Sequence, residues 1–122
     1  MSVPTSLGSW AAFIRLNNYQ AFLFMKGTIF NEVLQKVADV TGLNREKILY
    51  GKCEESTDAR YILIHALYKV GMSLLDIANL TCRTRQAVGY LMNNYKKSQK
   101  WMLENDLKSV LKWVESNYFS SK

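Results

Sequence analysis

The stretch from Ser73 to Lys100 constrains the fold most, because two helical patterns stand there only a few residues apart. Ser73, with Asp76 three residues later, resembles a capping box at the start of a short helix, LLDIANL. Thr84 is the expected N-cap of a second, longer helix. Apolar residues recur on this second helix at helical spacing, at Val88, Leu91, Met92 and Tyr95. The stretch therefore predicts two helices joined by a tight turn at residues 81–83, which is the helix-turn-helix arrangement.

The rest of the chain continues the helical pattern. It has 122 residues, which indicates one domain, and 48% apolar residues, which is typical of a folded protein. One Pro in the whole chain leaves long uninterrupted segments. Besides the two helices above, apolar periodicity and glycine stops predict helices over residues 28–41, 44–50, 58–70 and 101–119. We expect an all-α bundle of about five to seven helices.

Three segments follow from this pattern. Residues 1–27 form an N-terminal extension, for which two interpretations stay open: a short helix packed on the domain, or residues before a natural start at Met25. Residues 28–100 hold the helix-turn-helix. Residues 101–122 form a C-terminal amphipathic helix that closes the core, packs on the N-terminal segment or makes a homodimer.

The positive charge is concentrated in the same region. The chain has a net charge of +6, from 16 basic and 10 acidic residues. Five of the bases and none of the acids lie between Ile77 and Leu103, which leaves 11 bases against all ten acids elsewhere. A clustered basic patch attracts a polyanion more strongly than scattered charge does. Double-stranded DNA is the expected partner, and a solvated lysine face is the alternative.

The second helix of such a pair enters the major groove, with its N-terminal residues at the base edges. Arg85 there matches guanine O6 and N7, or alternatively holds a phosphate, and Gln86 matches adenine. Arg83, Thr81 and Thr84 are placed to hold phosphates, where the helix N-terminus also favours an anion. The face opposite the apolar stripe adds three further candidate contacts: Tyr90, Asn93 and Lys97.

Residues 30–97 resemble the C-terminal DNA-binding domain of the bacterial replication initiator DnaA. Three local sequences carry this resemblance: ILYGKCEEST, DARYILIHAL, and CRTRQAV where the family has a signature close to GGRDHTTV. The resemblance implies a DNA-contacting loop with Lys52 and a DNA contact at Arg60, for which a salt bridge to Glu55 or Asp58 is the alternative. It also implies the DnaA-like fold.

The departures from the family change what the resemblance implies. Arg83 and Val88 match the signature, but its Asp and His are replaced by Thr84 and Arg85, and the turn lacks its two glycines. The chain has no GxxxxGK[ST] phosphate loop, so it lacks the initiator's ATPase. We expect a stand-alone phage or mobile-element regulator of transcription or replication with its own target sequence. The alternative is a protein-interaction module that keeps the fold without binding DNA.

Other classes of function have little support. No nucleophile, base and orienter form a set, so we expect no enzyme, small-molecule substrate or cofactor. The single histidine, His65, lies on an apolar helix and is interpreted as a packed residue. Cys53 and Cys82 have no zinc-ligand spacing, so no metal is expected. No apolar run reaches transmembrane length and the N-terminus is a poor signal peptide, so a cytoplasmic location is expected.

Overall fold

The computed structural model of the chain describes residues 18–93, 95 and 101–119, with side chains from Met25 onward except at Trp101. These residues contain α-helices, one π-helical turn and no strand, which confirms the predicted all-α bundle. None of the described helices is long and apolar enough to cross a membrane. In chain order the elements are α2 (Asn18–Thr41), α3 (Arg45–Tyr50), α4 (Glu54–Val70), α5 (Leu74–Thr81), α6 (Arg85–Asn93), α7 (Trp101–Val114) and the π-helical η1 (Glu115–Phe119).

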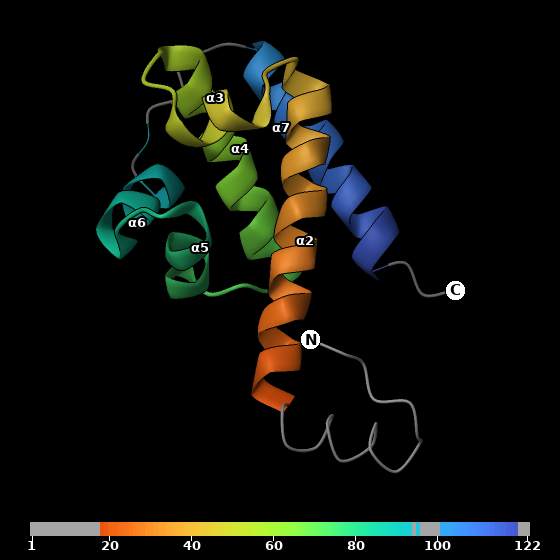
Figure 1. Cartoon of the computed structure of the whole chain (residues 1–122). Coiled ribbons are helices and arrows are strands. Elements are labelled where there is room, and N and C mark those ends of the chain that lie inside the picture. Colours follow the sequence, from red (N-terminus) through yellow and green to blue (C-terminus); the bar gives the residue numbers. More distant parts are fainter. Residues whose placement is uncertain (1–17, 94, 96–100, 120–122) are drawn as a thin grey trace.

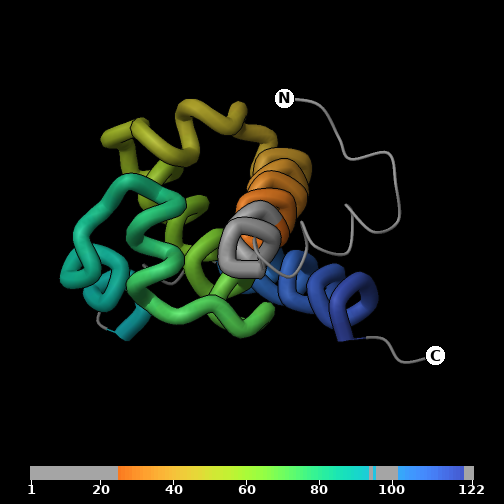
Figure 2. The backbone as a smooth tube through the Cα atoms, turned by 60° about the horizontal axis from the view of Figure 1, so that its bottom comes forward, coloured from red at the N-terminus to blue at the C-terminus, as the bar shows by residue number. Residues whose placement is uncertain are grey.

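Helix α4 is the centre of the bundle. It packs against α2, α3, α5, α6 and α7 (Figure 1). The α5–α6 pair lies on one side of α4 and α7 on the other, in both views of the backbone (Figures 1 and 2). This arrangement follows from the α4 sequence, because a helix that is apolar nearly all round must be covered on every side. Its fully buried side chains include Ile62, Leu63, Ile64, Ala66 and Leu67.

One hydrophobic core joins two of the predicted segments, residues 28–100 and residues 101–122. Val33, Leu34 and Val37 of α2 lie in the same buried cluster as α4 and α6. The cluster also contains Leu103, Val110 and Val114, so α7 closes the core rather than standing apart from it. Of the three roles predicted for residues 101–122, core closure is confirmed; α7 also packs against α2, and the homodimer stays a prediction.

The predicted start of the first helix at Thr28 is wrong. Helix α2 begins at Asn18, ten residues before the expected start at Thr28, and it runs through Gly27 without a break. The single Gly is tolerated inside the helix, where its cost is only about 1 kcal/mol relative to Ala. Residues 18–27 are therefore the start of α2 and belong to the same element as Val33, while residues 1–17 lie outside the described part of the chain.

Glycines end three of the helices, as predicted, but for two different reasons. Gly42 and Gly71 have φ values of 78° and 118°, in the left-handed region that glycine adopts without strain. Gly51, at the end of α3, has an ordinary φ of −67°. A Cβ at Gly51 would lie 2.2 Å from the Ser56 Oγ and 2.5 Å from the Lys47 carbonyl oxygen. A side chain is thus excluded there by close packing of α3 on α4.

The start of α4 was predicted wrongly. The helix begins at Glu54 rather than Asp58, with Cys53 as its N-cap residue, so the expected loop at residues 52–57 is mostly helix. Two acidic residues in the first turn, Glu54 and Glu55, complement the positive end of the helix dipole and favour the earlier start. Ser56 is fully buried in the first turn of this helix.

Candidate nucleic-acid interface

The α5–α6 pair has the local geometry that the sequence predicts. The Ser73 hydroxyl accepts a hydrogen bond from the Asp76 N–H at 3.1 Å, and the Asp76 carboxylate accepts one from the Ser73 N–H. The capping box is therefore present. Helix α5 ends at Cys82, whose φ of 57° reverses the chain direction. The Thr84 hydroxyl then accepts from the Ala87 N–H at 3.0 Å and caps α6.

An ion pair ties this pair of helices to α2. The Lys26 ammonium lies 2.9 Å from the Asp76 carboxylate. The same carboxylate takes part in the capping box, so one side chain both starts α5 and fixes its position against α2. The hydrogen bond from Lys26 is the main reason that the pKa of Asp76 lies below its ordinary value.

Helix α6 has one buried face and one open face. Val88 and Leu91 are buried in the core, as the apolar stripe predicts. The open face carries the predicted contacts Arg85, Gln86, Tyr90 and Asn93, all of them exposed, and Tyr90 is 54% exposed. A Cβ at Gly89 would meet nothing within 4 Å. This face is therefore available to a partner, and it groups four of the ten predicted contacts on two turns of helix.

The position of Thr84 leaves it able to reach a phosphate. Its hydroxyl oxygen accepts the capping hydrogen bond, while its own hydrogen remains free to donate. Arg85, next to it, is exposed and makes no hydrogen bond or ion pair with another described residue. Together they place a cation and a donor at the first turn of α6.

Two of the predicted contacts are interior residues, so we correct them. Arg60 is only 7% exposed, and its guanidinium donates to the backbone carbonyls of Ile48 (2.9 Å) and Gly51 (2.8 Å). Thr81 is 3% exposed, and its hydroxyl donates to the Ile77 carbonyl at 2.8 Å. Neither side chain reaches the surface that a DNA backbone would touch. The position of Arg60 could not be predicted because its carbonyl partners lie at the end of another helix, α3. Thr81 was predicted to lie in the turn, whereas it is the last residue of α5.

Arg83 is partly engaged inside the protein and partly exposed to solvent. It is half-buried, and its guanidinium donates to the Leu49 carbonyl at 2.6 Å. Arg60 of α4 and Arg83 of the turn between α5 and α6 therefore donate to neighbouring carbonyls at the end of α3, where orphan acceptors and the negative end of the helix dipole favour cations. A role for Arg83 at a phosphate must use its remaining N–H groups.

The Arg83 contact also brings α3 beside the turn between α5 and α6. Lys52, predicted from the family loop, is exposed two residues beyond the end of α3. Lys47 and Tyr50 of α3 are exposed as well, Tyr50 by 61%, and sequence analysis did not select them. The signal that could have found them is the basic and aromatic spacing of KILYGK. Lys97, the remaining predicted contact, lies outside the described residues.

The end of α6 is anchored to α4 through Tyr95. Its hydroxyl donates to the Asp58 carboxylate at 2.5 Å. Burial, followed by the hydrogen bond and the charge of Asp58, raises the pKa of Tyr95 well above its ordinary value. Asp58 thus has a structural role, because it holds a tyrosine beyond the end of α6.

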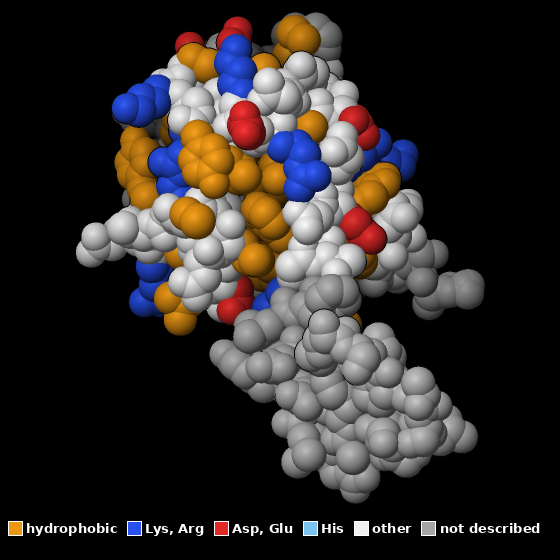
Figure 3. Space-filling view, viewed as in Figure 1, with side chains coloured by type: hydrophobic (Ala, Val, Ile, Leu, Met, Phe, Trp, Pro, Cys, Tyr) orange, Lys and Arg blue, Asp and Glu red, His pale blue; other side chains and the backbone are white. Residues whose placement is uncertain are grey.

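Basic side chains on the face seen in Figure 3 do not form one continuous patch. They alternate with hydrophobic and acidic side chains, and hydrophobic atoms are visible in a hollow beside α2. Of the five bases that concentrate the charge in the sequence, only Arg83 and Arg85 belong to the described residues.

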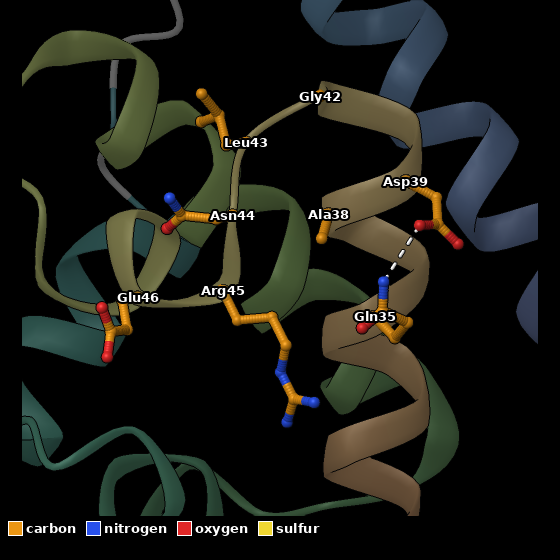
Figure 4. A pocket seen from close by; sticks show the side chains of 8 residues that line it. All are labelled: Gln35, Ala38, Asp39, Gly42, Leu43, Asn44, Arg45 and Glu46. Carbon is orange, nitrogen blue, oxygen red and sulfur yellow. Dashed lines mark hydrogen bonds between the residues drawn. The ribbon is translucent and has the colours of Figure 1, made fainter.

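A hollow of about 630 Å³ lies between the end of α2 and the start of α3 (Figure 4). Its acid Asp39 accepts a hydrogen bond from Gln35 at 3.0 Å, and Arg45 donates to Asn31. Among the described residues no group of three His, Cys, Asp or Glu could hold a metal ion. His65 packs its ring on Tyr61, with centroids 4.4 Å apart.

Comparison with protein-family models, curated proteins and solved structures finds no match to this chain. The arguments for a function therefore rest on the geometry and chemistry of the chain itself.

Proposed function

We propose that the α5–α6 pair is a helix-turn-helix and that this chain binds double-stranded DNA with α6 in the major groove. The observation that carries the proposal is the open face of α6. It presents Arg85, Gln86, Tyr90 and Asn93 to solvent, behind a turn of fixed geometry. An α-helix of this kind fits the major groove, and the types of side chain on it match base edges and phosphates.

The contacts around α6 hold the helix, and with it the exposed face proposed to bind DNA, in a fixed position. The helix is capped by Thr84, packed through Val88 and Leu91, and anchored at its far end by Tyr95. The half-buried Arg83 precedes its N-terminal turn and donates to Leu49 of α3, three residues before the exposed Lys52. We further propose, from the resemblance to the DnaA domain, that the chain acts in the control of transcription or replication.

A salt titration of binding to duplex DNA of mixed sequence tests the proposal. Lys52, Arg83 and the first turn of α6 allow about four phosphate contacts, for which the log–log slope of affinity against salt is about −3.6. The slope is measured by fluorescence anisotropy on a labelled duplex. Absence of binding at low salt contradicts the proposal.

The side chain that reads the sequence is tested with Arg85→Ala, on a site selected from a random DNA pool. We expect a loss of about 1–3 kcal/mol on that site and a smaller loss on unrelated DNA, because a bidentate base contact is lost only on the former. Lys108→Ala is the matched control. It removes one exposed cation from α7, on the opposite side of α4, and its effect should be negligible. If Arg85→Ala loses the same binding free energy on the selected site and on unrelated DNA, Arg85 contacts a phosphate and not a base.

A second candidate function is recognition of a protein. It is favoured by the exposed acids Glu54 and Glu55 at the start of α4, which oppose a phosphate, and by the exposed rings of Tyr50 and Tyr90. Tyrosines are enriched at protein interfaces. This candidate predicts no salt-dependent DNA binding, so the titration above separates the two.

A further inference from the structure

A small apolar cavity lies directly behind α6. It has a volume of about 300 Å³ and lies between α4 and α6. Its walls come from Ile64 of α4 and from one side of α6, with Tyr95 beyond them. The α6 residues that line it are Ala87, Val88, Tyr90 and Leu91, so Tyr90 borders both the cavity and the open face of the helix. An apolar cavity of half this volume is enough to hold benzene, so the space suffices for a small organic molecule.

One end of this cavity is cationic. Arg60 and Arg83 both line it, and Arg60 is more than nine-tenths buried. Burial, and next the charge of Arg83, lower the pKa of Arg60, so the two guanidinium groups act on each other. Neither has a carboxylate partner within the part of the chain that the structure describes.

Both arginines also retain unused donors. A guanidinium has five N–H groups. Arg60 uses three, on the carbonyls of Ile48 and Gly51 and on the Thr57 hydroxyl, and Arg83 uses one, on Leu49. The partners of both cations are uncharged carbonyl and hydroxyl oxygens, so an anion in the cavity would gain charge pairing with the two guanidinium groups and hydrogen bonds from their remaining N–H groups.

We propose that this cavity binds a small amphipathic carboxylic acid, with its carboxylate at Arg60 and Arg83 and its apolar body along Ile64, Val88 and Leu91. An uncharged molecule of the same shape would leave the cationic end unpaired. A molecule with a cationic head would be repelled by it. The class of ligand is therefore a monocarboxylate with a short aliphatic or aromatic body.

Such a ligand would lie against the back of α6, whose front carries Arg85 and Gln86. An acid in the cavity should therefore change the affinity for DNA. This second part rests on the proposed function, whereas binding of the acid does not.

Isothermal titration calorimetry of the full chain with octanoate, octanol and octylammonium tests the proposal without DNA. The three probes share one apolar body and differ in the charge of the head group. We expect saturable binding of one octanoate, with a Kd on the order of 0.1–1 mM, at least about tenfold weaker binding of octanol, and no binding of octylammonium. No saturable octanoate binding, or equal binding of octanoate and octanol, overturns it.

Two variants locate the site. Arg83→Gln should weaken octanoate about tenfold and leave octanol unchanged, because it removes charge and keeps hydrogen bonding. Ala87 lines the cavity and is exposed, so the larger side chain of Ala87→Leu should fill the cavity and abolish binding of both octanoate and octanol. Circular dichroism verifies that each variant is folded. Unchanged octanoate binding in folded Ala87→Leu overturns the assignment to this cavity.

The proposed effect of the acid on the affinity for DNA is measured separately. Octanoate should shift the anisotropy curve of the wild-type chain on DNA and should not shift that of Ala87→Leu. If octanoate binds by calorimetry and the DNA curve does not move, the link between cavity and DNA is refuted. If no DNA binds at all, the proposed function fails while the calorimetric result stands.

Discussion

Arg60→Met is the substitution that best separates an interior role from a DNA contact. The resemblance to DnaA places Arg60 on DNA, whereas the structure places its guanidinium on the carbonyls of Ile48 and Gly51. Methionine retains much of the apolar stem and removes the charge and all five donors. If the interior role is correct, the loss must appear in the free energy of unfolding of the protein without any DNA.

The magnitude follows from what is lost and what is relieved. Two hydrogen bonds from a charged donor contribute about 1.5–3 kcal/mol each, so their loss costs about 3–6 kcal/mol. Removing a buried guanidinium relieves its desolvation and its repulsion with Arg83, which offsets a part of that loss. We expect a net decrease of about 2–3 kcal/mol in the free energy of unfolding. This corresponds to a decrease of roughly 6–15 °C in Tm for a chain of this size.

Urea unfolding followed by circular dichroism at 222 nm measures this change. Arg85→Met is the matched control, because it makes the same chemical change at an exposed residue, where the effect should stay within about 0.5 kcal/mol. An Arg60→Met variant as stable as this control, but impaired in DNA binding, would refute the interior role and return Arg60 to the interface.

Two further predictions concern the α5–α6 pair. Cys82→Gly should stabilise the protein by about 0.5–1 kcal/mol in the same assay, because Cys82 has a φ of 57° that glycine adopts without strain, and Cys82→Val should destabilise it. Asp76→Asn should cost about 1 kcal/mol at pH 7, through the ion pair with Lys26 and the capping box. Since the pKa of Asp76 is lowered on folding, its stabilisation is present above the ordinary value of 3.8 and is lost as the pH falls below it. The free energies of unfolding of the wild-type chain and of Asp76→Asn should therefore converge in acid. A difference between them that stays constant down to pH 2 would disprove the role of the charge.

The elements that sequence analysis predicted well are those encoded by neighbouring residues. The caps at Ser73 and Thr84 and the stop at Gly71 each depend on a few adjacent residues, and all three are present. The burial of Val88 and Leu91 follows in the same way from helical spacing.

The errors fall where tertiary contacts decide. Arg83 meets a carbonyl 34 residues away, and Arg60 meets one 12 residues away. No periodicity in the sequence indicates that these two side chains would converge on the end of α3. Their types are correct for a DNA contact, yet their partners are backbone atoms that α3 presents only after it has packed on α4.

The shared carboxylate of Asp76 has a consequence for the order of folding. Its Oδ2 atom accepts from the Ser73 N–H, which is local, and from the Lys26 ammonium, 50 residues away in sequence. The first turn of α5 therefore gains its full set of hydrogen bonds only when α2 has docked. Helix nucleation at this point and long-range assembly become one cooperative event, so the α5–α6 pair and α2 should form together in the folding transition state rather than in sequence.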